Sequence, residues 1–270
     1  MGRPLIMLTN DDGLHSPGLK VAAEALAGLG DVLVAAPYEQ QSSTGRSMAK
    51  SSSRIIHQEV MVLNGKSCPV YGIEGTPAQA VQHGMLELAP RMPDLVVSGI
   101  NFGENMGVSI TISGTVMAAY EGAAWGVPAI AVSAQMEKEE ILSLSEDVDV
   151  GISGHFTQKF ARIVLANRLP ADVHILKIDV PSSATPETPW RLTRLSRQNY
   201  YIAHKPRRTD FSEPVELDWD MTYDPASLEP DSDIYTLRVA GEVSVAPLSL
   251  DFSSRLDLGA FENEMRSDRD

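Results

Sequence analysis

The stretch PLIMLTNDDG, residues 4–13, sets a pattern that is repeated along the first part of the chain. A short apolar run ends in polar residues, and a helix with one apolar face is expected to follow over residues 17–29. A second apolar run covers residues 31–36. Unbroken apolar strands that alternate with amphipathic helices are typical of a parallel sheet covered on both faces. The stretch therefore predicts an α/β fold with right-handed crossovers.

The same alternation continues to about residue 181. Further apolar strands are expected at residues 95–98, 128–133 and 173–178, and further helices at residues 114–126 and 152–164. Thr76 before Pro77 matches a helix cap followed by a first-turn proline, so we interpret this pair as a helix start rather than as a site. Together these elements predict a core with a mostly parallel sheet over about residues 1–181.

Beyond residue 181 the apolar residues nearly alternate with polar ones. Residues 190–195 alternate, and two apolar runs at residues 234–239 and 243–245 flank Gly241, which predicts an antiparallel ribbon. We therefore expect one domain, made of the core and of a C-terminal ribbon and arm over about residues 182–258.

Two segments of this C-terminal part are read differently. Residues 205–233 are polar and interrupted by prolines, and they are longer than most loops of a compact domain, so we expect them to pack against another subunit. Residues 259–270 are expected to form a frayed tail.

The composition excludes several classes of protein. The 270 residues are 43% hydrophobic and carry a net charge of −14, which opposes binding to polymeric nucleic acid or to an anionic membrane surface. No apolar run approaches the length of a membrane-spanning helix, so a cytoplasmic protein is expected. Cys68, the single cysteine, cannot form an intrachain disulfide or a zinc site by itself, and it is read as a half-buried strand residue.

Polar loops follow three of the expected strands, at residues 9–13, 37–45 and 99–107. Because ligands bind outside the carboxyl ends of parallel strands, these loops are expected to converge on one site. Their candidate metal ligands all offer oxygen, which favours magnesium, manganese or calcium over zinc: Asp11, Asp12, Ser42 and Asn101. The alternative is that the Asn-Asp-Asp-Gly string is ordinary turn chemistry.

An anion site is expected beside these ligands. The glycine-rich loop at residues 99–107 can turn its backbone N–H groups toward an oxyanion, and Ser113-Gly114-Thr115 opens a helix whose N-terminus suits a phosphate. The alternative for Ser113 is a plain helix cap.

Other polar residues near these loops are interpreted more conservatively. His15 could act as a general acid, but a lone histidine in a polar loop is more often incidental. Nothing local distinguishes Glu39 and Glu104 from solvated surface charges, and Arg46 could contact an anion, although a surface role is favoured. The chain has no dinucleotide fingerprint after the first strand, no P-loop and no Gly-x-Ser-x-Gly nucleophile motif.

Several ordered motifs together resemble the SurE family, the stationary-phase survival proteins known as 5'/3'-nucleotidases. The matching pieces are LTNDDG at residues 8–13, SPG at 16–18, STG at 43–45, GTPA at 75–78, PDLVVSGIN at 93–101, GENMG at 103–107 and SGT at 113–115. The resemblance extends with few interruptions from residue 5 to residue 133, and more weakly over residues 176–181 and 233–250.

The resemblance implies a site, a fold and an assembly. One divalent cation, magnesium or manganese with calcium as a further option, would be bound by Asp11, Asp12, Ser42 and Asn101. The phosphate of the substrate would lie against Asn101, Asn105, Ser113, Gly114 and Thr115, with Asp11, Asp12, Asn105 and Ser113 in catalytic roles. The implied fold is a three-layer Rossmann-like core with a C-terminal arm exchanged between the subunits of a dimer or tetramer.

Two residues depart from the family pattern. Family members usually carry an acidic residue and a tyrosine shortly before Ser-Gly-Thr, where this chain has Ser109 and Ile112. The expected function is hydrolysis of nucleoside 5'- and 3'-monophosphates to nucleoside and phosphate. The alternatives are a nucleotide or phosphate sensor with little turnover, and a polyphosphate or general phosphomonoester hydrolase.

Overall fold

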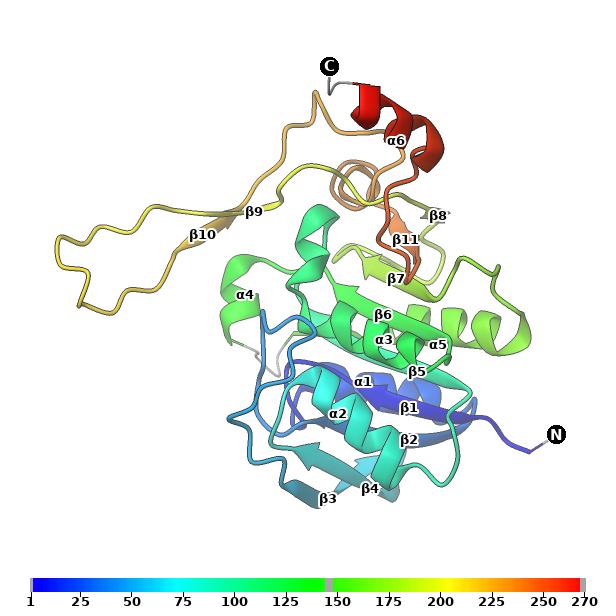
Figure 1. Ribbon diagram of the computed structural model, residues 1–270. Helices are drawn as coiled ribbons and strands as arrows, with labels where there is room; N and C mark the ends of the chain where they lie inside the picture. Colours follow the sequence, from blue (N-terminus) through cyan, green and yellow to red (C-terminus); the bar gives the residue numbers. More distant parts are fainter. Residues whose placement is uncertain (1, 144–147, 268–270) are drawn as a thin grey trace.

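The computed structural model describes residues 2–143 and 148–267, and a twisted nine-stranded sheet forms the centre of this part of the chain (Figure 1). Its strand order is β3-β4-β2-β1-β5-β6-β7-β11-β8. The strands are β1 (Leu5–Thr9), β2 (Asp31–Pro37), β3 (Ile56–Leu63), β4 (Lys66–Ile73), β5 (Leu95–Phe102), β6 (Ala129–Ala134), β7 (Ile175–Val180), β8 (Trp190–Leu192) and β11 (Val243–Leu248). The pairs from β4 through β2, β1, β5 and β6 to β7 are all parallel, as the unbroken apolar strands predict.

Helices cover both faces of the sheet (Figure 1). They are α1 (Pro17–Leu26) and α5 (Gly151–Ala166) on one face, and α2 (Pro77–His83) and α3 (Gly114–Ala124) on the other. Alternate residues of each strand point to opposite faces, so Ile6 and Leu8 of β1 join the core under α1 and α5, while Met7 joins the core under α2 and α3. The structure confirms the predicted α/β fold with three layers.

A β-hairpin formed by β3 and β4 extends the sheet at one edge, and the sequence analysis did not predict it. Its turn consists of Asn64 and Gly65, both with positive φ, between the paired residues Leu63 and Lys66. Asn-Gly between two apolar runs is a strong hairpin signal, because both turn residues adopt left-handed backbone conformations easily. The signal was therefore present in the sequence.

The predicted C-terminal antiparallel ribbon is present as a small two-stranded sheet, but Tyr201–Ala203 and Trp219–Met221 form it rather than the expected residues. Strand β11 pairs antiparallel with β7, but β8 pairs parallel with β11, and both strands belong to the main sheet. Residues 234–239 were expected to form a strand, and this prediction was wrong because Tyr235–Val239 forms a helical turn instead. Ile234 and Leu237, three positions apart, are both buried, which suits a helical period better than a strand period.

The expected frayed tail is also corrected. Leu258–Ser267 forms helix α6, whose first turn is capped by the Asp257 carboxylate that accepts a hydrogen bond from the Ala260 N–H at 3.0 Å. None of its residues is buried. Only residues 268–270 of the predicted tail lie outside the described part of the chain.

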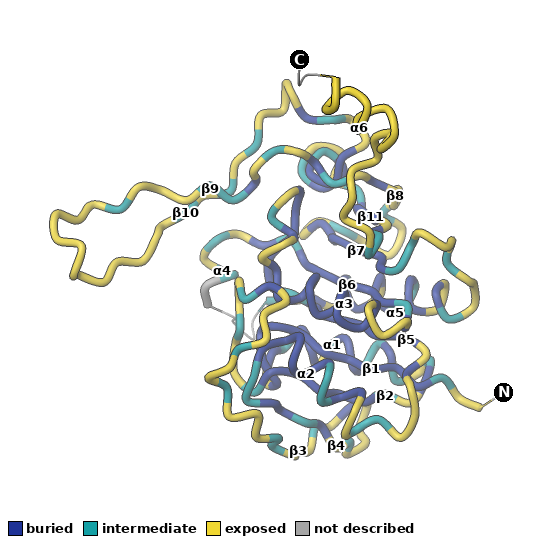
Figure 2. Tube along the Cα trace, viewed as in Figure 1, coloured by how far each residue is buried: buried dark blue, intermediate teal, exposed yellow. Residues whose placement is uncertain are grey.

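A long arm projects from the core and contains the two short antiparallel strands β9 (Tyr201–Ala203) and β10 (Trp219–Met221) (Figure 1). Figure 2 shows a buried core between the helical layers and an arm that is mostly exposed beyond these strands. None of the helices in the described ranges combines the length and the apolar character that crossing a bilayer requires.

Candidate active site

A cavity of about 870 Å³ lies where the carboxyl ends of β1, β2 and β5 meet the base of the arm. These three strands are neighbours in the sheet, so the loops that follow them are brought together as the strand-end rule predicts. The cavity is lined by Asp11, Gln40, Ser42, Ser43, Asn101, Phe102, Gly103, Glu104, Asn105, Ser109, Ile112, Ser113, Ile141, Tyr201, Ala203, Leu217 and Trp219.

Two adjacent carboxylates lie at this side of the sheet, and Asp11 lines the cavity while Asp12 does not. Asp11 and Asp12 come two and three positions after the end of β1 and are only 4% and 7% exposed. Burial raises the pKa of both groups, and the negative charge of Asp11 raises the pKa of Asp12 further. Among the described residues no Lys, Arg or His forms an ion pair with either carboxylate. A cation bound beside the pair would favour the charged form of both groups.

The N-terminus of α3 holds Asp11 in place. The Thr115 hydroxyl donates to Asp11 Oδ1 and also lies 3.1 Å from Asn101 Oδ1, while the backbone N–H groups of Gly114 and Thr115 are directed at the Asp11 carboxylate. Position 114 requires glycine, because a Cβ there would lie 2.6 Å from Asp11 Cβ and Oδ2. These contacts use the positive end of the helix dipole to stabilise a buried anion.

The second predicted carboxylate is fixed from a different strand. Asp12 Oδ2 accepts a hydrogen bond from the Phe102 N–H at 3.1 Å, and the Gln40 side chain also hydrogen-bonds to Asp12. Gln40 Nε2 donates to Ser42 Oγ at 3.0 Å. Gln40 thus connects the loop after β2 to the acidic pair, a role that nothing in the sequence of the loop indicates.

Asn101 lines the cavity from the end of β5, and Asn105 lines it from the loop that follows. The pairing of β5 with β6 shifts register between Ser98 and Asn101, which is the kind of irregularity that redirects side chains at sites. Asn101 Nδ2 donates to the Gly103 carbonyl at 2.5 Å. Asn105 Nδ2 donates to Ser133 Oγ at 2.8 Å, and Asn105 is 9% exposed at the cavity wall.

Comparison with known proteins identifies the family of this chain. The family model described as "Survival protein SurE" matches residues 6–202. The chain belongs to the SurE family. A relative from Thermococcus kodakarensis named "5'-nucleotidase SurE" is 38% identical over 252 residues, covering 93% of this chain and 95% of the relative. One from Archaeoglobus fulgidus with the same name is 38% identical over 258 residues, covering 95% of each chain. The crystal structure of the SurE protein from Aquifex aeolicus matches with a TM-score of 0.76 at 29% identity, covering 97% of this chain and all of that one.

The structure divides the predicted site residues of this SurE chain into two groups. One group lines the cavity and consists of Asp11, Ser42, Asn101, Asn105 and Ser113. The other group lies behind the cavity wall and consists of Asp12, Gly114 and Thr115, of which the last two support Asp11. Ser113 Oγ accepts a hydrogen bond from the Val116 N–H at 3.0 Å, so it caps α3 as well as facing the cavity. The departures Ser109 and Ile112 both line the cavity.

Other candidates of the sequence analysis lie elsewhere. His15 is exposed and its Nε2 lies 3.7 Å from Glu59 Oε1, outside the lining of the cavity. Arg46 pairs with buried Glu121 at 2.7 Å, which ties the Ser42 loop to α3. Reading Glu104 as a solvated charge was wrong, because it is 1% exposed and is paired with Arg238.

The arm contributes residues that the sequence analysis missed. Tyr201, Ala203, Leu217 and Trp219 form an apolar wall of the cavity, and they are joined by Phe102, Ile112 and Ile141. Trp219 is held by Lys138, whose ammonium lies 5.0 Å from the centre of its ring. These residues are far from the polar loops in the sequence and belong to none of the motifs, so only the three-dimensional structure shows that they reach the cavity.

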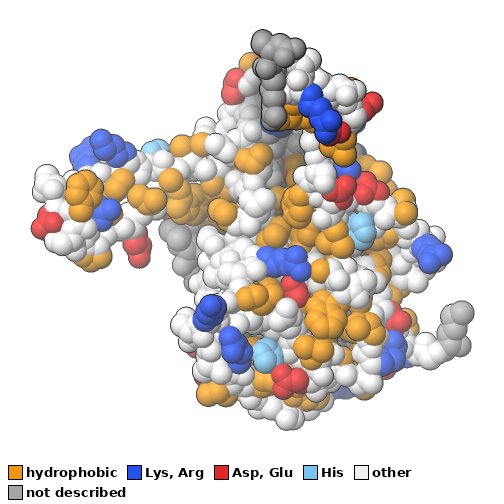
Figure 3. All heavy atoms as spheres, viewed as in Figure 1, with side chains coloured by type: hydrophobic (Ala, Val, Ile, Leu, Met, Phe, Trp, Pro, Cys, Tyr) orange, Lys and Arg blue, Asp and Glu red, His pale blue; other side chains and the backbone are white. Residues whose placement is uncertain are grey.

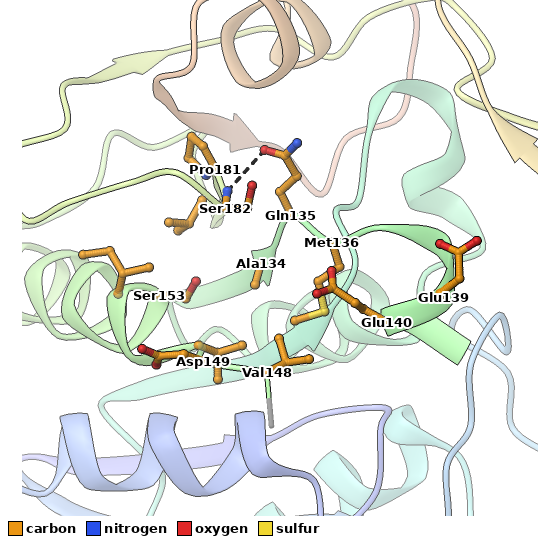
Figure 4. A pocket seen from close by; sticks show the side chains of 13 residues that line it. Ala134, Gln135, Met136, Glu139, Glu140, Val148, Asp149, Ser153, Pro181 and Ser182 are labelled. Carbon is orange, nitrogen blue, oxygen red and sulfur yellow. Dashed lines mark hydrogen bonds between the residues drawn. The ribbon is translucent and has the colours of Figure 1, made fainter. Parts of the chain in front are cut away.

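A second cavity of about 650 Å³ lies beside the ends of β6 and β7 (Figure 4). Gln135 Oε1 accepts a hydrogen bond from the Ser182 N–H across it at 3.3 Å. None of the predicted site residues lines this cavity. The acidic pair and the asparagines therefore make the first cavity the candidate active site.

The donor set of the first cavity fits a hard divalent cation. Two buried carboxylates, one amide oxygen and one hydroxyl are the oxygen ligands that magnesium, manganese and calcium prefer. Within the described ranges no group of three or more His, Cys, Asp or Glu side chains is arranged to hold a metal ion. A cation in this cavity would therefore need amide or hydroxyl ligands beside the carboxylates.

Replacing Gly114 tests the close contact between α3 and the acidic pair. Gly114→Ala is expected to lower the free energy of unfolding by about 1–3 kcal/mol, because the added methyl group overlaps the Asp11 side chain. Gly28→Ala is the matched control, since the nearest atom to its Cβ lies 4.0 Å away. Urea unfolding followed by circular dichroism measures both variants, and equal stabilities would contradict the contact.

Proposed function

We propose that this chain is a metal-dependent phosphomonoesterase that hydrolyses nucleoside 5'- and 3'-monophosphates to nucleoside and phosphate. The observation that carries the proposal is a single cavity lined by two chemically different sets of side chains. Carboxylate, amide and hydroxyl groups form one set, including Asp11, Asn101 and Ser113. Apolar and aromatic side chains form the other set, including Ile112, Tyr201 and Trp219.

A nucleotide has two parts that match these two sets. Its phosphate suits the polar side chains, where a cation would offset the acidic pair, and its base suits the aromatic side chains, because every base can stack on an aromatic ring. The names of the relatives, "5'-nucleotidase SurE", support this substrate class.

Asp11, Asp12, Ser42 and Asn101 are the proposed ligands of one divalent cation, magnesium or manganese, and calcium also fits the donor set. When bound there, the cation would polarise a phosphoryl oxygen and the attacking water. A cytoplasmic location for the protein stays a prediction from the sequence.

The protein's own groups would orient the phosphate. Asn105 has a second amide N–H besides the one used by Ser133, and it can donate to a phosphoryl oxygen from the cavity wall. Ser113 faces the cavity and can donate its hydroxyl proton to another oxygen while it accepts from Val116. Thr115 and Gly114 act through Asp11, because their donors are directed at its carboxylate. Water attacks phosphorus, the ester P–O bond breaks, and the leaving oxygen takes up a proton.

A phosphate or nucleotide sensor is the second candidate. It is favoured by Ser109 and Ile112, which line the cavity where an acidic residue and a tyrosine are expected in this family. Phosphate release from a panel of 5'- and 3'-monophosphates and of polyphosphate, with manganese or magnesium and with an EDTA control, separates the candidates. Binding of nucleotide without release of phosphate would favour the sensor.

We also propose that the arm joins subunits into a dimer or tetramer. Apolar side chains continue along the arm beyond the cavity (Figure 3), and Phe211 is 88% exposed and Val215 39% exposed. Burying such side chains against a second copy would remove a large apolar surface from water.

Asp11→Asn is expected to lower turnover at least about 100-fold, because it removes one charge from the proposed cation site at a buried position. Folding should be little affected, since the change also relieves the repulsion between the two carboxylates. Phosphate release from nucleoside monophosphates with manganese is the measurement. The control is Asp172→Asn, which removes an exposed carboxylate just before β7, at the amino ends of the parallel strands and away from the cavity. Parental turnover in Asp11→Asn would refute the site.

Trp219→Ala tests the base-binding wall. The KM for a nucleoside monophosphate is expected to rise about 10-fold, as the loss of one stacking contact implies, while the KM for glycerol phosphate stays within about 2-fold. The arm should keep its position, because Lys138 binds the backbone carbonyl of residue 219. Phe211→Ala, an exposed aromatic on the same arm, is the control. Equal changes for both substrates would favour a general phosphomonoester hydrolase.

Sedimentation velocity tests the subunit contact. The parent protein is expected to sediment as a dimer or tetramer, and the double variant Phe211→Ser, Val215→Ser should shift toward the monomer because the apolar contact is lost. Val60→Ser on β3, which removes an exposed apolar side chain elsewhere, should leave the mass unchanged. A monomeric parent would show that the arm does not join subunits.

A further inference from the structure

Lys177 on β7 is a fully buried lysine beside the candidate active site. Its side chain has 0% exposure, and its ammonium donates to Asp179 Oδ2 at 2.5 Å and lies 3.1 Å from Asp233 Oδ2. Both carboxylates are also fully buried. Burying three charged groups is costly even when they are paired with one another, and the packing of the fold does not require them. The cluster therefore suggests a role in the neighbouring site.

The third hydrogen bond of the lysine goes to the site. Lys177 Nζ donates to the backbone carbonyl of Asn105 at 2.6 Å. Asp179 Oδ1 accepts from the Asn105 N–H at 2.9 Å, and Ser133 Oγ accepts from Asn105 Nδ2 at 2.8 Å. Three side chains therefore hold the backbone and the carboxamide of one residue of the cavity wall.

The strand register explains how three residues meet at one asparagine. Lys177 and Asp179 are two positions apart on β7 and point to the same face of the sheet, and Ser133 on β6 is the register partner of Asp179. The three side chains thus form a rigid platform on adjacent strands beneath the loop that carries Asn105. Groups fixed to strands hold a site more accurately than groups on loops.

The charges of the cluster suit this arrangement. Burial alone would lower the pKa of Lys177, but the two neighbouring carboxylates together outweigh it, so its pKa is raised and the lysine is positively charged. Burial raises the pKa of Asp179 to about 6 even though Lys177 opposes the shift. A charged ammonium is the group that binds a peptide carbonyl and a carboxylate at once.

The arm holds the same loop from its other side. Asp233 Oδ2 accepts from the Gly107 N–H at 2.9 Å, and a Cβ at Gly107, whose φ is +52°, would lie 2.9 Å from the Ser196 carbonyl oxygen. Tyr201 donates its hydroxyl to the backbone carbonyl of Glu104 at 2.5 Å. The residues before and after Asn105 are therefore also fixed, and the lysine cluster acts at the centre of an ordered segment.

We propose that Lys177 and Ser133 are positioning residues for the phosphate of the substrate, which they act on only through Asn105. The inference rests on the proposed phosphomonoesterase function. Neither side chain lines the cavity, but both form hydrogen bonds that orient Asn105, which does line it. Misplacement of a substrate-binding group by about 1 Å lowers the rate of an enzyme by roughly 100-fold, which sets the scale of the effect.

The test is a double-mutant cycle with Asn105→Ala. Lys177→Met keeps the length of the side chain and removes its charge and donors, and Ser133→Ala removes only the acceptor of the carboxamide. The kcat and KM for a nucleoside monophosphate with manganese, and inhibition by inorganic phosphate, are measured for each variant in both backgrounds. Circular dichroism gives the folded fraction, and the rates are corrected for it.

The expected result is a loss of kcat/KM of about 10- to 100-fold for Lys177→Met and about 10-fold for Ser133→Ala in the parent background. Inhibition by phosphate should weaken in parallel. In the Asn105→Ala background each variant should change kcat/KM by less than about 2-fold, because the residue through which they act is gone. Equal losses in both backgrounds, or no loss in the parent, would overturn the inference.

Two further outcomes are distinguishable. If Lys177→Met fails to fold because it leaves two buried carboxylates unpaired, Ser133→Ala decides the question, since it disturbs no charge. If the parent protein hydrolyses none of the nucleotides, the proposed function fails. In that case binding of inorganic phosphate by calorimetry replaces the rates, and unchanged binding in Ser133→Ala would overturn the positioning role.

Discussion

The crowding of two carboxylates at the end of one buried strand is the constraint on which the candidate site depends. Asp11 and Asp12 are almost entirely removed from water, burial raises the pKa of both, and the charge of Asp11 raises the pKa of Asp12 further. The surrounding structure offsets the cost of ionising the pair with dipoles rather than with a cationic side chain. The N-terminus of α3 is directed at Asp11 and the backbone of β5 at Asp12, so the fold itself partly offsets the charge of the pair.

The sequence was sufficient to predict the parallel core and the polar part of the site. Apolar strands are recognisable because burial on both faces leaves them unbroken, and the loops after β1, β2 and β5 converge because those strands are neighbours. The carboxylates and asparagines belong to these loops or to the end of β5, so residue type and position along the strand were enough to group them.

The rest of the site could not be predicted because it depends on the path of the chain in space. Trp219 lies in a polar segment whose sequence gives no sign that it returns to the cavity. Lys177 interrupts an apolar strand, and its partner Asp233 is 56 positions away, so no local pattern relates them. Residues 234–239 were misassigned since a short apolar run has no decisive period, and only tertiary packing selects the helical turn.

The hydrogen bond between Gly107 and Asp233 joins residues 126 positions apart. Contacts of such separation form late, because the intervening chain must be in place before the loop can close. On a ribosome, a nascent chain can therefore assemble β1, α3 and the acidic pair while the segment around Asn105 still lacks its final support. The loop that carries Asn105 is therefore completed only after most of the chain has been translated, and the core of the fold forms before this part of the cavity does.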